Sequence, residues 1–169
     1  IYQKLGVANR TALAAIALCR ALGLDDAFIA QRLSSFHLPP MRMERKVLGR
    51  VILINDAYNA NLESMTAAIN ELKDMAAPGR KILVCGDKLE LGAFSEELHR
   101  QIGRMLTGGW LDILCAVGPM AAVAAEEAIA GGLSREQVLF VPDSATAAAV
   151  LLDRIQADDT LLLKGSRGM

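Results

Sequence analysis

The sequence predicts an α/β protein with a Rossmann-like, mostly parallel sheet, helices on both faces of that sheet, and a short helical segment before it. Short runs that are apolar throughout recur between residues 51 and 163, as expected of strands that are buried on both faces. A helical pattern of ten or more residues separates each run from the next, and this alternation requires a mostly parallel sheet. Residues 1–36, in contrast, carry helical patterns only.

The beginning of the chain forms a segment of its own. Gly23 should stop a first helix, and Asp25 or Asp26 should cap a second one. Two short helices cannot close a hydrophobic core alone. Two consecutive prolines, the second of them Pro40, interrupt helix and favour extended backbone, so we expect a linker there. The expected domains are residues 1–40 and residues 41–169.

The elements of the second domain follow from local signals. Residues 43–47 and 50–55 can pair as a hairpin through Leu48 and Gly49. The expected elements after that hairpin are a helix from Glu63 or Ser64 to the stop at Pro78 and Gly79, a strand at 81–85, a helix capped by Ser95, a strand at 113–117, an alanine-rich helix opened by Gly118 and Pro119, a strand at 138–141, a helix capped by Asp143 and a strand at 160–163.

Composition excludes several classes of protein. A net charge of −1 and 4% aromatic residues leave no basic or base-stacking surface for nucleic acid. Cys19, Cys85 and Cys115 lie in apolar segments and are expected to be buried free thiols in a reducing cytoplasm. His37 and His99 lack partners at metal-ligand spacing, so we expect no metal site. No apolar run approaches the roughly 18 residues of a membrane span, and no signal peptide is recognisable.

A cluster of polar residues directly after the strand at 51–54 is the first candidate site. It consists of Asn55, Asp56, Tyr58, Asn59 and Asn61. Polar groups at the carboxyl end of a parallel strand, just before a helix, lie where open α/β sheets bind ligands. The alternative is that these residues only form a turn and cap the helix.

Two further loops should reach the same edge of the sheet. Asp87 and Glu90 follow a strand and place two carboxylates three residues apart, or else belong to a glycine turn with solvated charges. Lys164, Ser166 and Arg167 offer two cations and a hydroxyl group, which suits a phosphate or a carboxylate. The alternative for this last group is a solvated, charged chain end. In either case we expect the cations to be exposed, so that replacing them leaves stability nearly intact.

Three segments together resemble the MurF branch of the Mur ligase family. DAYNANLESM at 56–65 is similar to the family's D-x-YNANP-x-SM, GDKLELG at 86–92 to GDM-x-ELG, and LLLKGSRGM at 161–169 to VKGSRGM. The chain departs from these patterns at Leu62, where the family has proline, and at Lys88, where it has methionine. The family's HNxxN asparagines, near the adenine nucleotide, are replaced by Ala8 and Thr11.

The resemblance implies an ATP-dependent ligase that adds D-alanyl-D-alanine to UDP-N-acetylmuramoyl-tripeptide through an acyl phosphate, in cytoplasmic peptidoglycan synthesis. Residues 1–40 would be the helical tail of its central ATP-binding domain, and residues 41–169 its C-terminal domain with the carboxyl end missing. The partners would be the two substrates and the enzyme's own N-terminal and central domains. No phosphate loop occurs in the chain, so the groups that hold ATP phosphates and Mg²⁺ would come from the central domain, and the chain alone should not turn over ATP.

The resemblance also implies residue roles. Arg42 would reach the terminal phosphate and act catalytically, and Asp56 would bind the ribose with Tyr58 and Asn59 beside it. The alternative for Arg42 is a surface salt bridge with Glu44 or Asp56. The residues that would face the peptide substrate or the dipeptide are Asn61, Asp87, Glu90, Lys164, Ser166 and Arg167, with Lys88 placing a charge beside them.

Two other functions remain open. One is a non-catalytic nucleotide-binding or interaction module with a doubly wound fold. The other is a different Mur-type ligase, with an amino acid or a folate as substrate.

Overall fold

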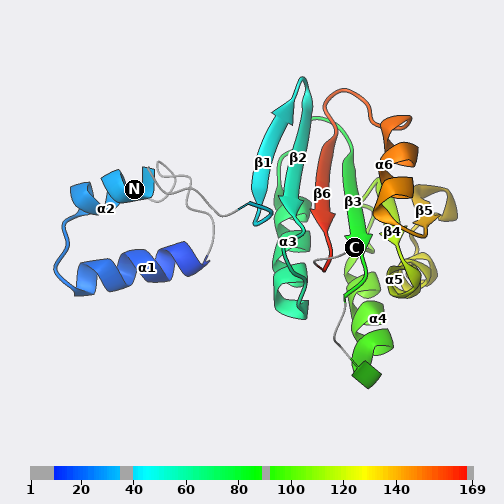
Figure 1. Cartoon of the computed structure of the whole chain (residues 1–169), viewed down its shortest axis with the longest axis horizontal. Helices are drawn as coiled ribbons and strands as arrows, with labels where there is room; N and C mark the ends of the chain where they lie inside the picture. The colour runs from blue at the N-terminus through cyan, green and yellow to red at the C-terminus, as the bar shows by residue number, and fades with distance from the viewer. Residues whose placement is uncertain (1–9, 35–39, 89–91, 167–169) are drawn as a thin grey trace. The chain divides into compact units, whose positions relative to one another are not determined.

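The computed structural model describes residues 10–34, 40–88 and 92–166, and Figure 1 shows the whole chain. It divides into two compact units, Ile1–Leu38 and Pro39–Met169, which are described separately below. Within the described residues, no helix combines the length and the hydrophobicity that a membrane crossing requires. The assignment of the first unit to another domain stays a prediction.

The first unit contains the two expected helices, α1 (Arg10–Ala21) and α2 (Asp26–Ser34). Gly23 follows α1 with a positive φ of 82°, the left-handed conformation that ends helices and favours glycine. Asp25, rather than Asp26, is the cap of α2, because its side chain accepts a hydrogen bond of 2.8 Å from the Phe28 amide.

The second unit is a six-stranded sheet with the strand order β1-β2-β6-β3-β4-β5. All neighbouring strands are parallel except β1 and β2, which form the predicted antiparallel hairpin. The elements in chain order are β1 (Glu44–Leu48), β2 (Val51–Asp56), α3 (Leu62–Asp74), β3 (Lys81–Gly86), α4 (Ser95–Met105), β4 (Ile113–Val117), α5 (Pro119–Ala130), β5 (Val138–Val141), α6 (Ser144–Leu152) and β6 (Thr160–Lys164). The predicted Rossmann-like fold class is therefore confirmed.

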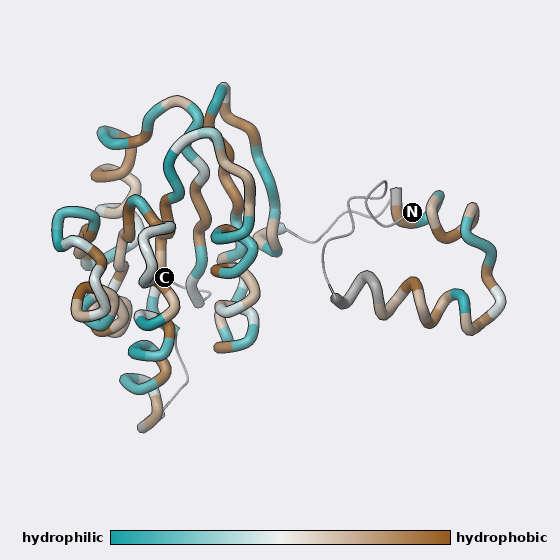
Figure 2. Tube along the Cα trace, turned by 180° about the vertical axis from the view of Figure 1, so that it is seen from behind, coloured by the Kyte–Doolittle hydropathy of each residue, from teal (hydrophilic) through white to brown (hydrophobic). Residues whose placement is uncertain are grey.

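The helices cover both faces of the sheet (Figure 1). On one face, Met65 of α3, Ile102 of α4 and the alanines of α5 share a hydrophobic core with Leu83 and Leu162 of the strands. The core on the other face contains residues of α6 together with Ile82, Cys115 and Leu161. Figure 2 shows the hydrophobic residues concentrated along the strands, as expected of a sheet buried on both sides. The alanines let α4 and α5 pack closely, and a Cβ atom on Gly103 would lie 2.3 Å from the Ala124 carbonyl oxygen.

Three helix starts test the predicted caps. Asn61 caps α3 through a reciprocal pair of hydrogen bonds with Ser64, so this helix begins one or two residues earlier than expected. Asp143 caps α6 as predicted, accepting a 2.7 Å bond from the Thr146 amide. The prediction for Ser95 is wrong: Ser95 is the first residue inside α4, and the preceding Phe94 makes no side-chain cap. A short 3₁₀ helix leads directly into α4 and fixes its start instead.

The three cysteines are free thiols. Cys85 and Cys115 are buried as predicted, and burial raises their thiol pKa values to about 12 and about 11. Cys19 is only partly buried.

The amino-terminal edge of the sheet is held by a buried ion pair. Arg80 donates two hydrogen bonds, of 3.0 and 2.7 Å, to the Asp159 carboxylate, whose side chain is 1% exposed. Burial opposes ionisation of Asp159, but the bonds from Arg80 and from the Gln156 amide outweigh it and hold the pKa of Asp159 below its ordinary value.

This pair predicts a specific response to acid. Because the folded-state pKa of Asp159 is lowered, the pair stabilises the fold fully above about pH 5, and this stabilisation is lost as the pH falls through that pKa. We expect Arg80→Met to lower the free energy of unfolding at pH 7 by about 2 kcal/mol and to weaken its dependence on acid. Urea titrations of both proteins at pH 7 and pH 3 measure this effect. An unchanged pH dependence in the variant would contradict it.

Candidate functional site

The carboxyl ends of the parallel strands bring the predicted loops together at one edge of the sheet. Strand β6 lies between β2 and β3, although it is the last strand of the chain. In this register Lys164 lies beside Asp56 on one side and Cys85 on the other. The loop after β6 is therefore flanked by the loops after β2 and β3, with the loop after β4 next in line.

Lys164 is the central residue of this edge. It is 3% exposed, and its Nζ lies 2.8 Å from Asp56 Oδ2, 2.7 Å from the Asn59 carbonyl oxygen and 3.2 Å from the Asp56 carbonyl oxygen. Our expectation of a solvated cation is therefore wrong for Lys164, because the insertion of β6 into the sheet buries its side chain. The ammonium group holds the polar loop after β2 in place.

Asp56 completes the same arrangement. Its Oδ1 accepts a 3.0 Å hydrogen bond from the Met43 amide, and its Oδ2 faces Lys164. The Asp56 side chain is only 15% exposed. A carboxylate offers about four lone-pair positions, and these two contacts leave acceptor capacity for a ligand hydroxyl group.

Arg42 and Tyr58 form an exposed pair next to Asp56. The Arg42 guanidinium lies 4.2 Å from the centre of the Tyr58 ring, a distance that gives a cation–π contact. The Tyr58 amide donates a 3.0 Å bond to the Met41 carbonyl, which holds the two segments together. Met41 and Met43, on either side of Arg42, both have positive φ values, of 62° and 51°, which non-glycine residues rarely adopt.

The salt bridge that we considered for Arg42 does not form. In the described part of the chain, Glu44 pairs with Lys46 and Asp56 pairs with Lys164. A stacked guanidinium still directs its N–H donors outward in its own plane, which suits a phosphate. Arg42 thus contacts Tyr58 instead of either carboxylate, and its role toward an anion stays a prediction.

The two asparagines of the loop make local hydrogen bonds. Asn59 Oδ1 accepts a 2.8 Å bond from the Ala60 amide, and Asn61 Oδ1 accepts one of 2.7 Å from the Ser64 amide. The observed contacts of Asn61 are therefore those of a helix cap, which was the alternative to a binding role.

Asp87 joins three strand ends. It is 6% exposed, so the alternative of a solvated charge is wrong for this residue. Its Oδ1 accepts a 2.6 Å hydrogen bond from the Ala121 amide in the first turn of α5, and its carbonyl oxygen accepts one of 3.2 Å from the Ser166 amide. A carboxylate at a helix N-terminus complements the positive end of the helix dipole. Gly118 makes room for it, because a Cβ there would lie 2.7 Å from the Asp87 carboxyl carbon.

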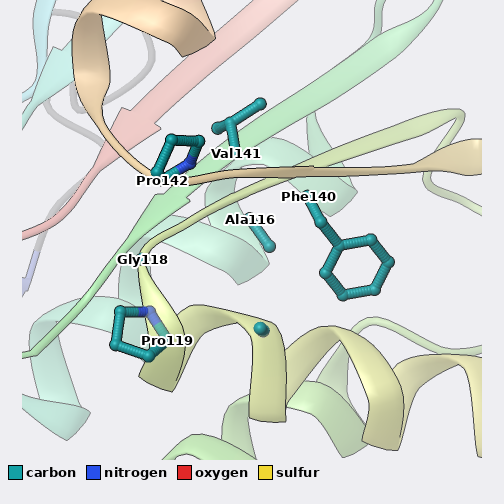
Figure 3. Close-up of a pocket in the computed structure, with 7 residues that line it drawn as sticks. Ala116, Gly118, Pro119, Phe140, Val141 and Pro142 are labelled. Carbon is teal, nitrogen blue, oxygen red and sulfur yellow. The ribbon is translucent and has the colours of Figure 1, made fainter.

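An open hollow of about 400 Å³ lies beside this junction, at the carboxyl ends of β4 and β5 (Figure 3). Figure 3 shows Pro119 at the start of α5, Pro142 beyond the end of β5 and the ring of Phe140 around it. The other lining residues are Ala116, Gly118, Ala122 and Val141. The lining carries no charged side chain and therefore suits a small apolar group better than a phosphate.

Comparison with known proteins identifies the family of this chain. Residues 41–167 match the family described as "Mur ligase, glutamate ligase domain". The chain belongs to the Mur ligase family.

Three relatives within this Mur ligase family show the extent of the similarity. The UDP-N-acetylmuramoyl-tripeptide–D-alanyl-D-alanine ligase of Bacillus subtilis is 33% identical over 94% of the chain, which covers 35% of that enzyme. A crystal structure of MurF from Acinetobacter baumannii is 32% identical, with a TM-score of 0.77 over 92% of this chain and 34% of that one. A crystal structure of MurF ligase from Thermotoga maritima in complex with ADP is 28% identical, with a TM-score of 0.71 over 91% of this chain and 33% of that one. The chain spans about a third of the length of the curated relatives that it matches.

The two departures from the Mur ligase motifs have different structural consequences. Leu62 is the first residue of α3 and packs against the core. Proline is favoured at this first helical position, so leucine keeps the helix start and adds apolar contact. Lys88 is 2% exposed, and its Nζ has no hydrogen-bond partner among the described residues. Burial lowers the pKa of Lys88, the interaction with Cys85 opposes this shift, and the nearby charge of Lys164 adds to it.

Two predicted site residues of this Mur ligase domain, Glu90 and Arg167, lie outside the described residues. Among residues 10–34, 40–88 and 92–166, no group of three or more His, Cys, Asp or Glu side chains could hold a metal ion. Sequence reasoning missed the buried His99, which it considered only as a metal ligand. No local sequence signal indicates this position, because the contact of His99 with the Lys88 amide joins α4 to the loop after β3.

Proposed function

We propose that this chain is the carboxyl-terminal part of an ATP-dependent ligase that adds D-alanyl-D-alanine to UDP-N-acetylmuramoyl-tripeptide during cytoplasmic peptidoglycan synthesis. The observation that carries the proposal is the 33% identity to the Bacillus subtilis enzyme of that name over 94% of the chain. In this proposal residues 1–40 are the helical tail of a central ATP-binding domain, and residues 41–169 are the domain that closes over it.

The proposed reaction has two steps. A carboxylate oxygen of the tripeptide attacks the terminal phosphate of ATP, which gives an acyl phosphate and ADP. The amine of the dipeptide then attacks the acyl carbon, loses a proton and displaces inorganic phosphate, so that an amide bond forms. Such chemistry depends on positioning and charge stabilisation, which a domain can supply when it brings fixed groups onto a bound nucleotide.

The nucleotide side of the edge would consist of Arg42, Asp56, Tyr58 and Asn59. Arg42, stacked 4.2 Å above Tyr58, would contact the terminal phosphate and stabilise the charge that develops on it. Asp56 is held by Lys164 and the Met43 amide and would accept a hydrogen bond from a ribose hydroxyl group. Asn59 would support this loop through its carbonyl oxygen, which contacts Lys164.

The substrate side would include the ends of β3, β4 and β6. Ser166 would offer its hydroxyl group to the peptide substrate or the dipeptide, while Asp87 and Lys164 fix the loops around it. Asn61, Glu90 and Arg167 complete the proposed substrate set. Mg²⁺ would neutralise the ATP phosphates. Because the chain has no phosphate loop, we assign the ligands of Mg²⁺ to the central domain.

Arg42 offers a direct test of the nucleotide side. We expect Arg42→Ala in the full-length ligase to lower kcat/KM for ATP by about 10- to 100-fold, because a charge-assisted hydrogen bond contributes roughly 1.5–3 kcal/mol. The melting temperature should stay near that of the parent, since Arg42 is exposed. Steady-state kinetics with varied ATP measures the effect, and Arg45→Ala, at an exposed position of β1, is the matched control. Equal kinetics for the two variants would remove Arg42 from the site.

The function itself is tested by substrate-dependent ATP consumption. The full-length protein should release phosphate only when UDP-N-acetylmuramoyl-tripeptide and D-alanyl-D-alanine are both present, and mass spectrometry should detect the pentapeptide product. Turnover with a single amino acid or a folate would instead indicate another ligase of the family. No ATP consumption with any of these substrates would favour a non-catalytic module. The isolated chain should show no turnover in any case.

A further inference from the structure

His99 lies fully buried on α4, with both ring nitrogens engaged. It is 0% exposed. Its Nδ1 lies 2.7 Å from the carbonyl oxygen of Ser95, one turn earlier in the helix. Its Nε2 lies 3.1 Å from the backbone nitrogen of Lys88, in the loop after β3.

These two contacts define the protonation of the ring. A backbone N–H can only donate, so Nε2 must accept the bond from Lys88 and carries no proton. The proton is then on Nδ1, where it is donated to the Ser95 carbonyl. Both hydrogen-bonding positions of a neutral imidazole are thus used. Protonation of Nε2 would place two N–H groups against each other, so the observed arrangement requires the neutral ring.

The segment that His99 holds joins the loops of the substrate side. Lys88 directly follows Asp87, whose carbonyl oxygen accepts a bond from the Ser166 amide and whose carboxylate accepts one from the Ala121 amide. These bonds connect the end of β3 to the loop after β6 and to the start of α5. The bond from the Lys88 amide to His99 ties the same segment to α4.

We propose that His99 is a positioning residue that sets the amine-substrate side of the site by fixing residues 86–88 to α4. The inference rests on the proposed function, because it needs a ligase with a dipeptide substrate. The nucleotide side does not depend on this bond, since Asp56 is held by Lys164 of β6 and by the amide of Met43, just before β1.

Two substitutions separate the contacts of the ring. In His99→Gln the terminal amide oxygen lies near the position of Nε2 and can still accept the bond from Lys88. In His99→Asn the side chain ends near the position of Nδ1 and cannot reach Lys88. Ile102→Val is the matched control, because Ile102 is equally buried on the same helix and makes no bond to the loop.

The kinetic test uses these variants in the full-length ligase. We expect His99→Asn to raise KM for D-alanyl-D-alanine about tenfold or more and to leave KM for ATP within about twofold, because displacement of a substrate-holding loop by about 1 Å has effects of this size. In His99→Gln the KM for D-alanyl-D-alanine should stay close to that of the parent. Ile102→Val should change the melting temperature without changing either KM. Equal changes in both KM values, or no rescue by glutamine, would overturn the proposal.

A spectroscopic test on the 169-residue chain separates this inference from the proposed function. The ¹⁵N chemical shifts of the His99 ring should show the Nδ1–H tautomer, and the Lys88 amide should exchange with solvent at least about tenfold faster in His99→Asn than in His99→Gln. An Nε2–H tautomer would overturn the anchoring by His99 whatever the enzyme does. The ring can show the expected tautomer while the full-length protein shows no dipeptide-dependent turnover. In that case the proposed function is wrong, and so is the role of His99 toward the substrate.

Discussion

Replacement of Lys164 by methionine is expected to lower the free energy of unfolding by about 3 kcal/mol. Methionine has a similar length but cannot donate to the Asp56 carboxylate or to the carbonyl oxygens of Asp56 and Asn59. Removal of one partner from a buried ion pair leaves the other charge without compensation, which costs roughly 3–5 kcal/mol when both are fully buried. We expect the lower end of this range because the Asp56 side chain is 15% exposed.

Urea denaturation of the chain measures this effect. Lys46→Met is the control, since Lys46 pairs with Glu44 at 3.1 Å on exposed strand β1 and should change stability little. The double variant Asp56→Asn with Lys164→Met should recover part of the loss, because it no longer leaves an unpaired carboxylate. A Lys164 variant as stable as the Lys46 control would show that Lys164 does not hold the loop.

Replacement of Gly118 by alanine should have an effect of similar size. Gly118 has φ 96° and ψ 169°, a region of backbone conformation that is open to glycine and strained by roughly 1–3 kcal/mol for other residues. The new Cβ would also lie 2.7 Å from the Asp87 carboxyl carbon and push this side chain away from the Ala121 amide. We therefore expect a loss of about 3 kcal/mol in the free energy of unfolding and, in the proposed full-length ligase, a higher KM for D-alanyl-D-alanine.

Gly108→Ala separates strain from displacement. Gly108 has a similar φ of 95°, but a Cβ there would have no atom within 4 Å. Its substitution should therefore show the cost of backbone strain alone. If the two glycine variants lose the same stability when measured by thermal unfolding, then the contact with Asp87 contributes nothing and this prediction fails.

The sequence by itself determined the elements of the second unit and most of their ends. The apolar strands and the amphipathic helices between them predicted a mostly parallel sheet, because burial patterns and connection lengths are local properties of the chain. Helix ends were also predicted correctly: Gly23 ends α1, Asp143 caps α6, and Gly118 with Pro119 begins α5. These effects depend only on a residue's own backbone or on residues within one turn. The prediction that Ser95 caps α4 was wrong because a preceding 3₁₀ helix moves the start of α4 by one residue.

Only the tertiary structure decided which residues of the site meet. Nothing in the local sequence shows that β6 enters the sheet between β2 and β3, because strand order depends on long-range packing. This insertion buries Lys164 against Asp56, 108 residues away in the sequence, and converts an apparent solvated cation into a structural one. The contacts of Asp87 with Ala121 and of Lys88 with His99 likewise join residues of different elements. Their roles follow from burial and hydrogen-bond partners, which the three-dimensional fold alone supplies.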